Sequence, residues 1–237
     1  MKTTIKLIAI GLFALASKDI VAQDVAGIKI GESFSAQKSL ITKANSDYQL
    51  NDITRPGGNT VGINAIAKKD GRVIDQMLVI HNDSGIVWFV GRAQALEKGA
   101  RINPDTLMSS LKEKYGNYSE ISGTGGPRWY FDRQGTLFQG SVIGSPCYRG
   151  IGPTGTSFNQ VPGTGMQVPT VFPPKCGLEI ETSVYQDSKD GMVSAFSVRI
   201  IDTKRMFDEL NNKSINAENE RKQQLEREKA NDNKPKL

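Results

Sequence analysis

Residues 60–92, TVGINAIAKKDGRVIDQMLVIHNDSGIVWFVGR, contain three stretches that have either the two-residue period or the short apolar run of a β-strand. The pattern predicts strands over 60–68, 72–82 and 85–92. They are separated by Asp70-Gly71 and by residues 82–85, which tolerate the positive φ that tight hairpins require. These short connections favour antiparallel neighbours. Because residues 86–90 are apolar on both faces, we expect the third strand to lie centrally, covered on both sides.

One helix is predicted before these strands and another after them. The first covers 35–45, with Ser35 at its N-cap, and carries an apolar stripe on one face. The second covers 104–115, with Asn103 at its N-cap and Gly116 at its end. Further strands are predicted over 118–122, 128–132, 136–143, 178–186 and 192–201.

The order of helix, strands, helix and strands predicts the fold class. It indicates an α+β fold, an antiparallel sheet of about eight strands with helices packed on one face. Residues 70–80 and 190–200 share an Asp-Gly turn and two later identities, which allows two helix-plus-meander repeats. The expected organisation is a signal peptide over 1–22, a single domain over 23–201 with possible halves 27–95 and 96–201, and a charged C-terminal helix or tail over 202–237.

Strand 178–186 alternates cleanly, so its two faces can be distinguished from the sequence. Leu178, Ile180 and Val184 share one face, and Glu179, Glu181 and Tyr185 share the other. We expect the acidic face to be exposed to water.

The N-terminal residues have the composition of a secretory signal. Lys2 and Lys6 precede an apolar run over 7–16, and small residues allow cleavage after Ala16 or Ala22. A run of ten apolar residues is too short to span a bilayer. We therefore expect an exported, soluble, periplasmic protein without stable membrane insertion. The formal net charge of +5 falls to +3 without residues 1–22, and no basic stripe indicates a nucleic-acid partner.

The two cysteines, Cys147 and Cys176, bracket an irregular segment. Residues 144–175 contain six glycines and six prolines, which disfavour regular structure. In an oxidising compartment we expect the two thiols to form a disulfide. The segment also carries side chains typical of interfaces, and the predicted binding residues are Tyr148, Arg149, Phe158, Met166 and Phe172. Whether this loop recognises a partner or covers the core is left open by the sequence.

Catalytic and metal-binding patterns point to no particular chemistry. His81 is the single histidine, and no nucleophile motif accompanies it. One histidine and two distant cysteines do not have zinc-ligand spacing. The loop 123–126 is glycine-rich but is followed by a predicted strand, not by the helix that a phosphate loop needs. We expect no enzyme activity, no catalytic residue, no metal and no cofactor.

The helix 104–115, Gly116 and the aromatic run Trp129-Tyr130-Phe131 carry a family resemblance. This part of the chain resembles exported modules of the SmpA/OmlA type, and two such units in tandem resemble the β-lactamase inhibitor protein architecture. The similarity covers about residues 27–143 and 177–201. It implies helices on one face of an antiparallel sheet and an open concave face that grips a protein. The chain departs from the lipoprotein members because it has no lipid-attachment cysteine, and the loop between Cys147 and Cys176 fits neither pattern.

These observations lead to a non-enzymatic periplasmic protein that binds another exported or envelope protein. The alternatives from other classes are binding of an envelope polymer such as peptidoglycan, and carboxylate-based hydrolysis of such a polymer. The charged segment 202–237 is either a solvated tail or a helix that docks on a partner.

Overall fold

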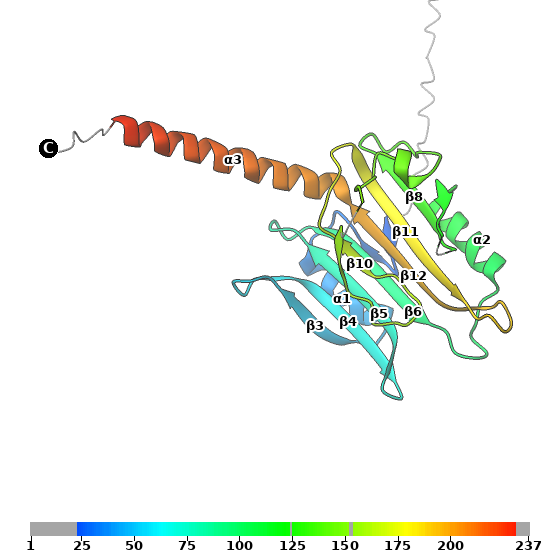
Figure 1. Cartoon of the computed structure of the whole chain (residues 1–237). Helices are drawn as coiled ribbons and strands as arrows, with labels where there is room; N and C mark the ends of the chain where they lie inside the picture. The colour runs from blue at the N-terminus through cyan, green and yellow to red at the C-terminus, as the bar shows by residue number, and fades with distance from the viewer. Residues whose placement is uncertain (1–22, 124, 152–153, 231–237) are drawn as a thin grey trace, which may run out of the picture.

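The structure, a computed structural model, describes residues 23–123, 125–151 and 154–230 (Figure 1). The predicted signal peptide, residues 1–22, lies outside this range. Among the described residues, no helix is long and apolar enough to cross a membrane.

Eight strands form one antiparallel sheet in the order β3-β4-β5-β6-β12-β11-β8-β7. At its centre β6 pairs with β12, with Ala95 opposite Ala195 and Phe89 opposite Ile201. The predicted α+β fold with an antiparallel sheet of about eight strands is thereby confirmed. The strands of the sheet are β3 (Gln49–Thr54), β4 (Thr60–Lys69), β5 (Arg72–His81), β6 (Val87–Ala95), β7 (Glu120–Ile121), β8 (Pro127–Asp132), β11 (Cys176–Gln186) and β12 (Val193–Asp202).

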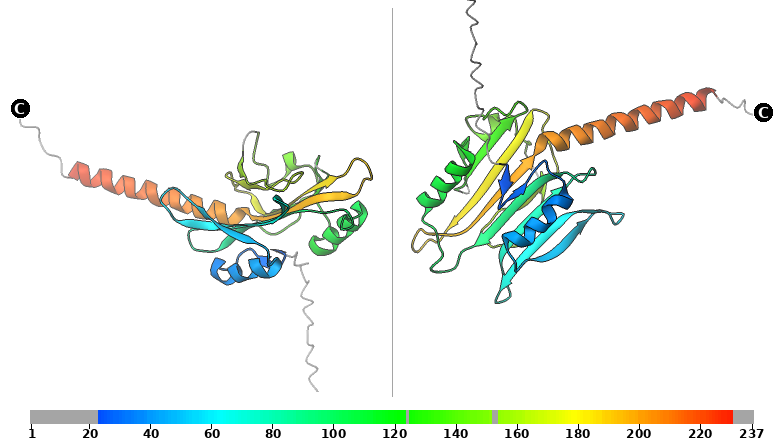
Figure 2. Two further views of the ribbon diagram at one scale, coloured as in Figure 1. Left: turned by 90° about the horizontal axis from the view of Figure 1, so that it is seen from below. Right: turned by 180° about the vertical axis from the view of Figure 1, so that it is seen from behind.

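In the described part of the chain, three α-helices, one 3₁₀ helix and two short strand pairs accompany the sheet. Helices α1 and α2 both cover one face of the sheet, as predicted, and β9 and β10 lie over the other face (Figure 2). Helix α3 projects away from the sheet (Figures 1 and 2). These elements are α1 (Phe34–Ala44), α2 (Pro104–Tyr115), α3 (Thr203–Ala230), η1 (Val142–Gly144), β1 (Asp24–Val25), β2 (Ile28–Lys29), β9 (Gly155–Ser157) and β10 (Gln167–Pro169).

The sheet consists of two groups of four strands that meet at their last members. Helix α1 precedes β3 to β6, and α2 precedes β7, β8, β11 and β12. Strand β12 is therefore the topological counterpart of β6. The sequence comparison of 70–80 with 190–200 instead pairs β5 with β12, so it is offset by one strand. Turn residues recur for local reasons, and the Asp-Gly pairs at 70–71 and 190–191 are an example.

Some predicted elements differ in the structure. Segment 136–143 forms no strand, because Gly140 has φ of 131° and Glu120 accepts a hydrogen bond from the Val142 backbone, which turns the chain into η1. The strand over 118–122 shortens to β7. Strand β3 was not predicted because most of its residues are exposed and polar. Helix α1 is capped by Ser33, not Ser35, and the Ser33 Oγ accepts from the Ala36 amide at 3.3 Å.

Buried apolar side chains cover both faces of the sheet. The helix side contains Ile41 of α1 and Leu107, Leu111 and Tyr115 of α2, packed against strand residues that include Trp129. The opposite side forms a separate cluster around Phe89. The expectation that the strand 85–92 is covered on both sides is confirmed, since Val87 to Val90 are all buried.

Helix α3 continues β12 without a linker. The carboxylate of Asp202, the last residue of β12, accepts a hydrogen bond from the Arg205 amide at 3.0 Å and so caps the helix. Thr203 and Met206 are buried, and beyond Leu210 nearly every described residue of α3 is exposed. The charged C-terminal segment is thus helical over 203–230, with only its first turns packed on the body.

The docking of α2 can be tested at Leu111. We expect Leu111→Ala to lower the free energy of unfolding by about 2–4 kcal/mol, because it leaves a cavity between α2 and the sheet. The neighbouring Lys112→Ala, on the exposed face of the same helix, should change it by less than about 0.5 kcal/mol. Urea unfolding of both variants measures the difference. Equal effects would contradict this packing.

Candidate functional site

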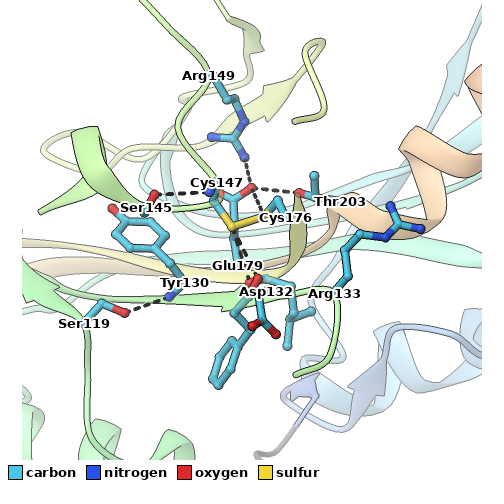
Figure 3. The surroundings of a disulfide bond; sticks show 12 residues. Ser119, Tyr130, Asp132, Arg133, Ser145, Cys147, Arg149, Cys176, Glu179 and Thr203 are labelled. Carbon is cyan, nitrogen blue, oxygen red and sulfur yellow. Dashed lines mark hydrogen bonds and ion pairs between the residues drawn. A yellow bond between two sulfur atoms is a disulfide. The ribbon is translucent and has the colours of Figure 1, made fainter. Parts of the chain in front are cut away.

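Residues 144–151 and 154–175, called the strap from here on, lie across the sheet face opposite α1 and α2 (Figure 2). A disulfide between Cys147 and Cys176 joins the beginning of the strap to the first residue of β11 (Figure 3). The two cysteines are 1% and 0% exposed, packed with Tyr130. The predicted disulfide is confirmed, and it is sealed from solvent.

Apolar side chains fix the middle of the strap to the sheet. Val161, Met166 and Val168 are buried against residues of β5 and β6. Met166 fits because the strand residue beneath it is Gly91, where a Cβ would lie 2.5 Å from the Met166 sulfur. The Phe172 ring packs edge-on against Trp88 at 5.4 Å between ring centroids. The strap therefore covers the core, which answers one of the two possibilities that the sequence left open.

Polar side chains of the sheet form hydrogen bonds with backbone amide and carbonyl groups of the strap. Gln76 of β5 is fully buried, donates to the Phe158 carbonyl at 2.7 Å and accepts from the Gln160 amide at 3.3 Å. Ser197 and Arg199 of β12 both donate to the Gly165 carbonyl at 3.0 Å. An irregular segment can lie against a sheet only when its buried backbone groups find such partners.

A buried ionic cluster lies beneath the start of the strap. Glu179 Oε1 accepts from Arg149 Nη2 at 2.7 Å and from Thr203 Oγ1 at 2.7 Å (Figure 3). Glu181 pairs with Arg199 of β12 and also lies 3.4 Å from Arg149 Nη1. The sequence-based expectation that this face of β11 meets water is therefore wrong. Strap arginine Arg149 covers both acids, which are 1% and 6% exposed.

The two carboxyl groups have opposite pKa shifts. Burial raises the pKa of Glu179 to about 7, with a contribution from the nearby charge of Glu181, while Arg149 opposes the shift. Burial also acts to raise the pKa of Glu181, but Arg199, Arg149 and Arg128 outweigh it and hold its pKa near 2. Glu181 is thus the charged partner of the arginines, and Glu179 is the more easily protonated acid.

Four of the five predicted binding residues have side chains that pack or pair with other residues of the same fold. Met166 is buried, Arg149 is ion-paired, and Phe158 and Phe172 pack against the apolar cluster around Phe89. Tyr148, at 36%, is the most exposed of the five, while Arg149, Phe158 and Phe172 are partly buried. Their role in contacting a partner stays a prediction, carried mainly by Tyr148.

A cavity of about 730 Å³ opens beside Pro162 and Gly163 of the strap. We call it the strap cleft. Its floor is formed by small strand residues, Ala95 and Ala195, and one wall by Tyr185. Tyr185 is 54% exposed, and its ring lies so close to Gly163 of the strap that a Cβ there would be 2.8 Å from the ring.

The opposite wall of the strap cleft belongs to the β4–β5 hairpin and the end of β6. It carries the apolar Val73 and a charged rim, in which Lys69 and Glu97 form an exposed ion pair at 2.7 Å and Arg72 is also present. An apolar floor with a few polar groups at its rim is the usual composition of a binding site.

Two residues that hold the strap on the sheet were not predicted from the sequence. Arg199 and Gln76 hold the strap, and neither follows a recognised motif. A usable signal existed: a glycine inside an apolar strand, Gly91, indicates close approach by another segment. Acids facing the same side as arginines on adjacent strands are a second signal, because buried charges occur in pairs.

The residues considered for catalysis or metal binding make packing contacts and bonds with other parts of the protein. The His81 ring packs on Phe34 at 4.6 Å between ring centroids, and its Nδ1 lies 2.7 Å from the Asn82 carbonyl. In the described part of the chain, Cys147, Cys176 and Glu179 place their ligand-type atoms close together. Both sulfurs are already bonded in the disulfide, so this group supports no metal site.

A third buried carboxylate, that of Asp75, lies on the helix side. Asp75 accepts hydrogen bonds from Tyr48, Arg92, Asn45 and Gln94. Burial, together with Asp75, raises the pKa of the Tyr48 hydroxyl well above its usual range. Because every oxygen of Asp75 is satisfied by neighbouring side chains, this cluster joins α1 to the sheet and presents no free polar group to a ligand.

Comparisons of the chain with protein-family models, with curated proteins and with solved structures found no match. The resemblance to SmpA/OmlA-type modules and to the β-lactamase inhibitor architecture therefore stays an expectation from the sequence.

The contribution of the disulfide can be measured directly. We expect the Cys147→Ala/Cys176→Ala variant to lose about 3–4 kcal/mol of stability in the chain-entropy picture, since the two cysteines are 29 residues apart. Urea unfolding under non-reducing conditions gives this value. A variant as stable as the original protein would show that the strap is held by its other contacts alone.

The raised pKa of Glu179 predicts a specific pH dependence. Its folded-state pKa lies above the unfolded value, so its contribution to stability is present below about pH 4.5 and is lost as pH rises through about 7. The lowered pKa of Glu181 acts in the other direction, with stability lost as pH falls from about 4.5 toward 2.

The difference in unfolding free energy between Glu179→Gln and the original protein should therefore change with pH. It should shift in favour of the variant by on the order of 2–3 kcal/mol as the pH rises from 5 to 8. Urea unfolding at several pH values measures the difference between the two proteins. The exposed Glu218→Gln serves as control and should give a flat difference over the same range. A flat difference for Glu179→Gln as well would contradict the assignment.

Proposed function

We propose that this chain is an exported, non-enzymatic protein that binds another protein at the strap cleft. The observation that carries the proposal is the construction of the cleft. A disulfide, buried ion pairs and apolar anchors fix the strap, and the fixed strap forms one side of a cavity of about 730 Å³. A site that is already ordered before binding loses little conformational entropy when a partner arrives.

The chemistry of the strap cleft suits apolar side chains presented by a protein surface. Ala95, Ala195 and Val73 offer an apolar floor and wall, and the ring of Tyr185 offers an exposed aromatic face. Lys69 and Arg72 stand beside Glu97 on the rim and can pair with charges of either sign around an inserted side chain. Buried apolar anchors surrounded by a polar rim are the arrangement of most protein interfaces.

An oxidising, exported location is supported by two independent features. The N-terminal residues have the order of a signal peptide, and the single disulfide joins the only two cysteines of the chain. A periplasmic protein fits both features.

The state of the acids favours binding over hydrolysis. Paired carboxylates act on glycosidic bonds from a cleft that the substrate can enter. Glu179 and Glu181 are instead sealed beneath Arg149. Arginines pair with one oxygen of Glu179 and with both oxygens of Glu181, and the second oxygen of Glu179 is buried out of reach of a substrate. These two acids serve the fold of the strap.

Site-directed crosslinking tests the proposal. A photoreactive phenylalanine analogue at position 185, expressed in the cells that export the protein, should capture one discrete protein partner. The same analogue at Ile121 serves as a control, because Ile121 is 53% exposed and Tyr185 is 54% exposed. Ile121 does not line the strap cleft, so it should capture nothing discrete.

A second substitution distinguishes specific binding in the strap cleft from non-specific adsorption to the surface. Ala195→Leu narrows the strap cleft from its floor and should lower the crosslinking yield from position 185 at least tenfold, with the melting temperature measured in parallel. Equal capture from 185 and 121, unchanged capture in the Ala195→Leu protein, or capture of glycan in place of protein would overturn the proposal.

A further inference from the structure

The carboxylate of Glu179 touches three parts of the chain that are distant in sequence. Its Oε1 accepts hydrogen bonds from Arg149 in the strap and from Thr203, the first residue of α3, each at 2.7 Å (Figure 3). The Cys176 sulfur of the disulfide lies 3.4 Å from the same oxygen. One buried atom therefore joins the strap, the disulfide and the exposed C-terminal helix.

These contacts cannot be replaced by solvent. Glu179 is 1% exposed and Thr203 is fully buried, while the other carboxylate oxygen of Glu179 is buried without a hydrogen-bond partner in the described structure. If either Arg149 or Thr203 moves away, the carboxylate loses a partner that water does not supply. Leaving a buried polar atom unpaired is costly, more so when it belongs to a charged group.

The charges around Glu179 come from every element that packs on it. Glu181 belongs to the same strand, Arg199 to β12 and Arg149 to the strap, and Arg128 of β8 acts on Glu181. Arg149 is shared between the two acids. Any displacement of the strap at Arg149 therefore alters both pairs together.

The start of α3 is fixed to the sheet by a cap and by a buried side chain, so we expect a change at Thr203 to reach the helix. Asp202 caps the helix directly after β12, and Met206 is buried in the same cluster as Met166 of the strap. The first turn of α3 thus rests on residues that the strap also contacts. Lys213 of α3 still pairs with Asp83, between β5 and β6, and beyond Lys213 the helix extends away from the body (Figure 1).

We infer that Glu179 couples the strap to α3, so that displacement of either one loosens the other. A partner that shifts the strap would thereby change the anchoring of the projecting helix. The coupling itself is a property of the free protein, so its test does not depend on the proposed function.

Amide hydrogen exchange of the free, disulfide-bonded protein tests the coupling in both directions. Thr203→Val removes the hydroxyl from the α3 side and should speed exchange at the strap amides of Tyr148 and Phe158 at least fivefold. These amides donate to Ser145 and Met166 carbonyls within the strap. Arg149→Gln, made on the strap side, should speed exchange of the Arg205 amide in α3 by a similar factor.

Three controls separate coupling from general destabilisation. Amides of β4 and β5 report global unfolding, and the changes in the strap and α3 must exceed theirs. Thr203→Ser keeps the hydroxyl and should restore slow exchange in the strap. Arg221→Gln breaks an ion pair on the exposed part of α3 and should leave the strap unchanged.

If Thr203→Val changes exchange only within α3, and Arg149→Gln only within the strap, the coupling is absent. If all amides change in proportion, both substitutions act through global stability and the inference is equally overturned. Either result leaves the crosslinking test of the strap cleft unaffected.

Discussion

Two glutamates of β11 lie on the sheet face that the strap closes to water. The packing of the strap on this face depends on how the charges of the two acids are compensated. A buried carboxylate without partners would cost several kcal/mol. Arg199 supplies compensation from within the sheet, but Arg149 comes from the strap. The strap therefore completes the folded state of the sheet, and its removal would leave two acids with one arginine fewer.

This requirement explains how a segment rich in glycine and proline can hold a defined position. Its backbone groups bond to Gln76, Ser197 and Arg199, and its apolar side chains meet the sheet at Gly91. Glycine and proline set the path. Strands β9 and β10 pair with each other within the strap, and the sheet supplies further partners for its backbone groups. The disulfide then reduces the freedom of the unfolded chain. Order in the strap is thus a tertiary property.

That tertiary origin also separates what the sequence could predict from what it could not. Strands β4, β5 and β6 and helix α2 follow from alternation, turn residues and caps, because these signals act between near neighbours. The exposure of Glu179 and Glu181 was misjudged because alternation distinguishes two faces of a strand but does not say what covers each. Arg149 lies 30 residues from Glu179 in the chain, and no local pattern links them. The disulfide was predictable because only two cysteines exist.

The position of the strap cleft follows from an asymmetry between the two halves of the sheet. In the first half, Asp70 and Gly71 join the second strand to the third, whereas in the second half the strap joins the corresponding strands β8 and β11. The strap cleft is lined by both of these connections, Lys69 to Val73 on one side and Pro162 and Gly163 on the other. A tight turn and a long insertion at equivalent places thus leave a hollow between them, floored by the small residues Ala95 and Ala195 of the two central strands. The cavity is therefore bounded by a short connection in one group of four strands and by a long connection in the other.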